Sequence, residues 1–116
     1  MPNYTEFSVT VKSTGDGNKY YINNIRQMPL ALTEGSVYRF DVSDSSVSGH
    51  ALLFSETRDG THNSGSTYST GVTTSGTAGS ANAYVEIVVA ENAPDLFYYC
   101  VNHSGMGGPV ETVGGS

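Results

Sequence analysis

Residues 96–106 read LFYYCVNHSGM, and this stretch decides both the predicted fold and the predicted site. Leu96–Tyr99 is a short apolar and aromatic run, which is typical of a β-strand. The residues that follow carry Cys100, His103 and Met106, so a thiol, an imidazole and a thioether recur at intervals of three. We therefore expect a strand that delivers its last residue into a loop rich in metal-binding side chains.

The rest of the chain also favours strands over helices. No window keeps apolar residues at the spacing of an amphipathic helix, whereas several segments alternate apolar and polar residues with the period of a strand. The expected strands are Phe7–Val11, Tyr20–Ile22, Val37–Val42, Ala51–Phe54, Ala83–Val89, Asp95–Tyr99 and Pro109–Val113, with at least one short edge strand near Tyr68–Val72. Seven or eight short strands at a spacing of about 8–12 residues predict an all-β sandwich.

The length of 116 residues suits a single domain, 1–116, with 114–116 as a frayed tail. The segment Glu56–Ser80 is long, polar and rich in glycine, serine and threonine. A loop of this length in a small domain is usually functional or contains small strands of its own. We expect it to act as a contact arm, so that deletion of residues 61–70 weakens assembly and leaves metal binding intact.

Composition excludes several classes of function. The chain has five lysine and arginine residues and a net charge of −6, which is too little positive charge for nucleic-acid binding. No apolar stretch approaches the roughly 20 residues needed to cross a bilayer. The first residues lack the features of a signal peptide, and the single cysteine excludes a disulfide within the chain.

A second candidate ligand lies about fifty residues upstream of the first. Gly49-His50 precedes the predicted strand Ala51–Phe54, so His50 stands at a strand start while Cys100 stands at a strand end. In an antiparallel pair these two positions meet. Two imidazoles and one thiolate with a weak axial thioether form the ligand set of a mononuclear blue-copper site. The predicted metal ligands are His50, Cys100, His103 and Met106.

Three other interpretations compete with copper. Zinc prefers four firm ligands from cysteine, histidine and carboxylates, and methionine is a poor one. A Cys–His nucleophile pair would need an oxyanion hole and an orienting group, which no local motif suggests, so we predict no catalytic residues and no enzyme. The third interpretation gives each residue an ordinary structural role, with Cys100 and Met106 as side chains that fill the core and His103 as a loop residue.

The spacing Cys-x2-His-x2-Met, with Gly-His at an upstream strand start, resembles the short ligand loop of cupredoxins of the amicyanin type. The resemblance implies a Greek-key β-sandwich in which His50, Cys100 and His103 are the equatorial copper ligands and Met106 the axial one. It also implies that the Gly49 carbonyl approaches the opposite axial side. One residue departs from the pattern, since many such proteins follow the first histidine with asparagine and this chain has Ala51. Asn102 and Ser104 are the candidates for a replacement hydrogen bond.

A second resemblance covers most of the chain. The segments that carry it are 32–41, 48–55, 58–62, 71–73, 93–100 and 103–108. They are similar to cupredoxin-like domains in structural proteins of marine bacteriophages, especially cyanophages. This implies a virion protein, such as a capsid decoration, cement or tail-associated component. Its partners would be the major capsid protein or tail proteins, and further copies of itself. The alternative is a soluble one-electron carrier in the periplasm or cytoplasm of a bacterium.

The remaining candidate residues are assigned ordinary roles. His62 lies in the turn-rich run Asp59–Asn63 and is expected to be a solvated loop histidine. The acidic residues near the His50 strand are too loosely spaced for calcium and are expected to be solvated. Two sequons, at Asn3 and Asn102, are short enough to occur by chance.

Overall fold

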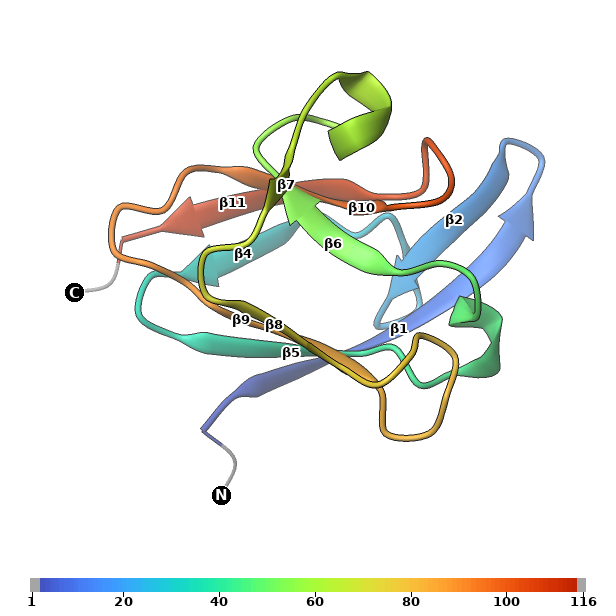
Figure 1. Ribbon diagram of the computed structural model, residues 1–116, viewed down its shortest axis with the longest axis horizontal. Coiled ribbons are helices and arrows are strands. Elements are labelled where there is room, and N and C mark those ends of the chain that lie inside the picture. Colours follow the sequence, from blue (N-terminus) through green and yellow to red (C-terminus); the bar gives the residue numbers. More distant parts are fainter. Residues whose placement is uncertain (1–2, 115–116) are drawn as a thin grey trace.

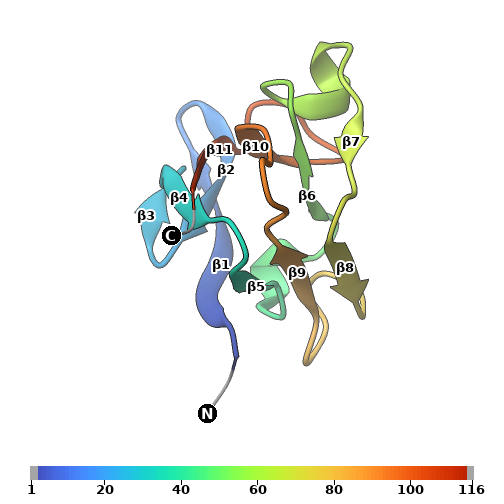
Figure 2. The ribbon, with the colours of Figure 1, turned by 90° about the vertical axis from the view of Figure 1, so that its left-hand side faces the viewer.

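The computed structural model describes residues 3–114 and shows an all-β protein built from two mixed sheets (Figures 1 and 2). One sheet has six strands in the order β3-β2-β1-β5-β9-β8, and the other has five in the order β4-β11-β10-β6-β7. The all-β prediction is confirmed.

The strands of the two sheets interleave along the chain. The six-stranded sheet contains β1 (Thr5–Thr14), β2 (Gly17–Ile22), β3 (Ile25–Arg26), β5 (Val37–Asp41), β8 (Val72–Ser75) and β9 (Tyr84–Val88). The five-stranded sheet contains β4 (Leu30–Thr33), β6 (Leu52–Ser55), β7 (Thr67–Tyr68), β10 (Leu96–Cys100) and β11 (Gly108–Val113). Each sheet has one parallel pair, β1 with β5 and β11 with β4.

The hydrophobic core includes side chains from both sheets. Alternate residues of β5 and β9 are buried, as the period-two pattern of their sequences predicts. Phe40 of β5 meets Phe54 of β6 edge to face at a centroid distance of 5.5 Å, and this contact joins the two sheets. The same core includes Cys100 and Met106 from the predicted site.

The described residues form eleven strands, more than the seven or eight predicted. Two of the extra strands, β3 and β7, are only two residues long, and such pairings leave no alternating pattern in a sequence. The prediction of at least one short edge strand near Tyr68–Val72 is confirmed, because β7 and β8 lie on either side of that position, one at the edge of each sheet. The long polar segment therefore crosses from one sheet to the other.

Helical structure within residues 3–114 is limited to two short 3₁₀ turns, η1 (Ser45–Val47) and η2 (Gly60–Asn63). Neither of these described helices is long or apolar enough to cross a membrane. Of the predicted frayed tail, Gly114 is exposed and follows β11, while residues 115–116 lie outside the described part.

Candidate metal centre

The pairing of β6 with β10 brings the two distant parts of the site together. These strands are antiparallel, with Cys100 opposite Leu52. The Val101 amide donates a hydrogen bond to the Ala51 carbonyl at 3.1 Å, which extends the pairing by one step. His50, just before β6, therefore lies beside Cys100 at the end of β10. His103 reaches the same place from the loop between β10 and β11.

The distances among these three side chains suit a shared metal ion. Cys100 Sγ lies 3.7 Å from His50 Nδ1 and 3.8 Å from His103 Nδ1. All three ligand atoms lie within 4.8 Å of one another. A metal with bonds of about 2.3 Å to sulfur and about 2.0 Å to nitrogen, as zinc has, separates these atoms by about 3.7 Å when the bond angle is near 120°. His50, Cys100 and His103 could therefore bind a metal.

Burial differs across the cluster in a way that matters for ligand chemistry. Cys100 is fully buried, His50 is partly buried and His103 is exposed. Burial, and secondarily the nearby His103, lowers the pKa of His50. Both effects favour the neutral imidazole, which is the form that binds metals.

Met106 lies in the same loop, and its side chain is fully buried in the hydrophobic core. The Tyr20 amide donates to its carbonyl at 3.0 Å, so the backbone of Met106 is fixed by β2. The cluster that the structure brings together consists of the two histidines and the cysteine. Met106 stays a predicted fourth ligand.

The segments that carry His50 and Cys100 are also tied by a side chain. Asn102 Nδ2 donates to the Gly49 carbonyl at 2.9 Å. The side chain of Ala51 cannot make such a bond. Of Asn102 and Ser104, the two residues predicted to replace it, Asn102 makes the hydrogen bond. The Gly49 carbonyl, predicted to approach a metal from the axial side, accepts this hydrogen bond.

Tyr20 is a site residue that the sequence did not reveal. Its hydroxyl donates to the His50 carbonyl at 2.6 Å, and its side chain is fully buried. Burial, followed by the proximity of Cys100, raises the pKa of Tyr20 well above its ordinary range. The hydroxyl therefore keeps its proton and remains a donor that holds the backbone at His50.

His62 is the second residue missed. It is exposed, as predicted for a loop histidine, but its Nε2 donates to the Cys100 carbonyl at 2.8 Å. Its ring also meets Tyr99 edge to face at 6.3 Å. Gly60 makes this approach feasible, because a Cβ there would come within 2.6 Å of the Tyr99 ring. The prediction of an ordinary solvated histidine was therefore incomplete.

No protein-family model matches the chain, and no curated protein matches it. The geometry of the His50, Cys100 and His103 cluster is therefore the basis for assigning chemistry to the protein.

Proposed function

We propose that this protein is a structural component of a phage virion whose cupredoxin-like sandwich binds one copper ion. His50, Cys100 and His103 would hold the copper ion, with Met106 as a weaker fourth ligand. The observation that carries the proposal is the convergence of one thiol and two imidazoles where β6 begins and β10 ends in an all-β fold.

The ligand set favours copper over zinc and over nucleophilic catalysis. A soft thiolate with two imidazoles and a thioether in the same loop suits Cu(I) and Cu(II), whereas zinc sites rarely use methionine. Cys100 is fully buried, and buried thiols are usually unreactive toward substrates. Burial therefore supports a ligand role for Cys100.

In a virion the metal would act mainly by stabilising the fold. It would join the start of β6 to the end of β10, two positions that are fifty residues apart. The single cysteine leaves no disulfide to do this within the chain. Metal binding contributes directly to folding free energy when only the native state presents the ligands. The virion location itself is supported by the resemblance of six segments to phage structural proteins.

The second candidate is a soluble one-electron carrier. Two observations favour it: the Asn102 hydrogen bond stiffens the two ligand segments, and His103 is exposed while the thiol is buried. A stiff site with one ligand at the surface suits electron transfer to a partner.

Titration of the metal-free protein with Cu(II) tests the site. We expect an intense thiolate-to-copper visible band that saturates at one equivalent. Met106→Leu should shift this band, whereas Met28→Leu, a matched change at a partly buried methionine outside the loop, should leave it unchanged. Absence of the band in the unaltered protein would refute the copper assignment.

Mass spectrometry of purified particles separates the two roles. The virion proposal predicts that the chain is present in intact particles of the phage that encodes it. Its absence there, together with a reversible copper couple in the isolated protein, would establish the carrier instead.

A further inference from the structure

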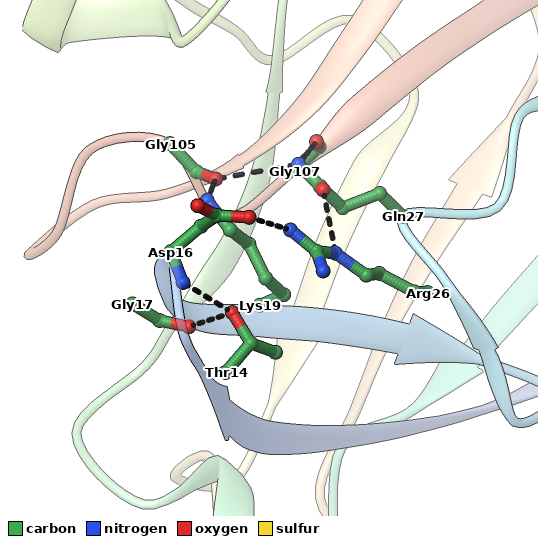
Figure 3. A network of polar contacts seen from close by, with 8 residues as sticks. All are labelled: Thr14, Asp16, Gly17, Lys19, Arg26, Gln27, Gly105 and Gly107. Atoms are coloured by element: carbon green, nitrogen blue, oxygen red, sulfur yellow. Dashed lines mark hydrogen bonds and ion pairs between the residues drawn. The ribbon is translucent and has the colours of Figure 1, made fainter.

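Residues 101–107, between β10 and β11, are here called the ligand loop, and their backbone is held on both sides of Met106 by side chains from distant parts of the chain. The Gly105 carbonyl accepts hydrogen bonds from Lys19 Nζ at 2.7 Å and from Gln27 Nε2 at 3.3 Å. Gln27 Nε2 also donates to the Gly107 carbonyl at 2.8 Å. Figure 3 shows Lys19 and Gln27 reaching these two glycines from the β2 and β3 side.

Asp59 holds the same segment from another part of the chain. Its Oδ1 accepts the Gly105 amide at 2.9 Å, from the turn that precedes η2. The Tyr20 amide donates to the Met106 carbonyl, so Gly105, Met106 and Gly107 each have a backbone group that is hydrogen-bonded to a residue outside the loop. In Figure 1 the loop between β10 and β11 lies beside the hairpin of β1 and β2.

Gln27 is itself supported by its neighbours. Arg26 Nε donates to Gln27 Oε1 at 3.4 Å, and the Arg26 guanidinium pairs with Asp16 at 3.0 Å. This leaves the amide nitrogen of Gln27 pointing at the loop, as Figure 3 shows. The Arg26–Asp16 pair is largely exposed, so its role is to orient Gln27 rather than to add much stability.

A loop with glycines on both sides of Met106, Gly105 and Gly107, would otherwise be costly to order, because glycine has the greatest backbone freedom. Contacts that exist without a metal remove that cost before the metal binds. Such preorganisation raises affinity by reducing what binding must order.

We propose that Lys19, Gln27 and Asp59, here named the loop clamp, hold residues 105–107 in their metal-binding shape before any metal arrives. These three are positioning residues, and they act on the metal through the backbone around Met106. The proposal thus has two steps, the shaping of the metal-free loop and its effect on the metal. The second step rests on the proposed copper function, and the first does not. The consequence is a site that needs little rearrangement to load and that releases its metal slowly.

Amide exchange measured by NMR on the metal-free protein tests the first step. Asp59→Gly keeps the left-handed backbone of this residue (φ 64°) and removes the acceptor. It should speed exchange of the Gly105 amide by roughly tenfold. Asp59→Asn keeps an acceptor oxygen and should restore most of the protection. Equal exchange in both variants and the unaltered protein would overturn the proposal.

The hairpin side of the clamp is tested by Lys19→Ala combined with Gln27→Asn, a change that shortens the amide side chain. The matched control is Lys12→Ala, because Lys12 lies directly opposite Lys19 in the strand pair and its amine rests on Tyr21 instead. The double variant should speed exchange across residues 105–107 by roughly tenfold, against a change within about twofold for the control.

Copper loss to a chelator tests the second step. The double variant should release copper roughly tenfold faster than the control. Equal release rates with altered exchange would overturn the claim that the clamp retains the metal. If the unaltered protein binds no copper, the proposed function fails, and the exchange measurements still decide whether the clamp shapes the loop. If the double variant does not fold, the two Asp59 variants decide it.

Discussion

Cys100 is the single residue on which the site depends most. We predict that Cys100→Ser abolishes the visible copper band, because the hydroxyl is a far weaker ligand for copper than the thiolate. Cys100 is fully buried, so a serine hydroxyl there would cost the metal-free protein about 1–3 kcal/mol if it finds no partner. Absorbance and urea unfolding measure the two effects. A band that survives the substitution would show that the thiol is not the copper ligand.

His50 makes the stability of the metal-free protein depend on pH. Its pKa in the folded state lies below the ordinary value of 6.5, so the unfolded state binds more protons as the pH falls. Stability is therefore fully present above about pH 6.5 and declines as the pH falls through that value toward the folded pKa. Urea midpoints between about pH 7.5 and about pH 5 measure this decline. His50→Gln should flatten it, and an unchanged slope in that variant would contradict the assignment.

At the scale of elements, the ligand loop lies directly against β10. A Cβ on Gly107 would come within 1.7 Å of the Tyr98 carbonyl oxygen, which is backbone and cannot move aside alone. We predict that Gly107→Ala destabilises the protein by about 2–4 kcal/mol and weakens copper binding. Gly15→Ala is the control, since a Cβ there meets nothing within 4 Å. Similar unfolding midpoints for the two variants would show that the loop is not packed in this way.

The segment between β6 and β8 changes one expectation. The sequence alone predicts that deletion of residues 61–70 leaves metal binding intact. In the structure this deletion would remove β7 and His62, whose ring donates to the Cys100 carbonyl. We therefore predict that the deletion weakens copper binding and lowers stability. The smaller change His62→Ala should alter the visible band while the fold is kept. Identical spectra for His62→Ala and the unaltered protein would show that this contact does not influence the site.

The part of the site that could be predicted from the sequence has a local signal or follows from strand pairing. Cys100 and His103 lie three residues apart at the end of β10, and the antiparallel pairing of β6 with β10 is what brings His50 to them. Tyr20 and His62 could not be predicted, because each hydrogen-bonds to a backbone carbonyl of a segment far away in the sequence. Such a contact leaves no recognisable residue spacing in the sequence. The clamp residues were missed for the same reason. The short pairings β3 and β7 depend on their neighbours rather than on their own residues.

At the scale of the whole molecule, copper binding should raise the free energy of unfolding. A ligand that binds only the native state stabilises it by about 2.7 kcal/mol at a free concentration one hundred times its Kd. For a protein of this size that corresponds to a rise in Tm of roughly 10 °C. Differential scanning calorimetry with and without copper measures the rise, and Cys100→Ser should show none. An equal rise in that variant would mean that copper binds elsewhere.

X-ray absorption at the copper edge, recorded on the protein loaded with one equivalent, identifies the metal ligands. We expect a coordination shell with one sulfur and two imidazole nitrogens at bonding distance, plus a weaker second sulfur that is lost in Met106→Leu. A shell of nitrogen and oxygen alone, with no sulfur at bonding distance, would contradict this assignment.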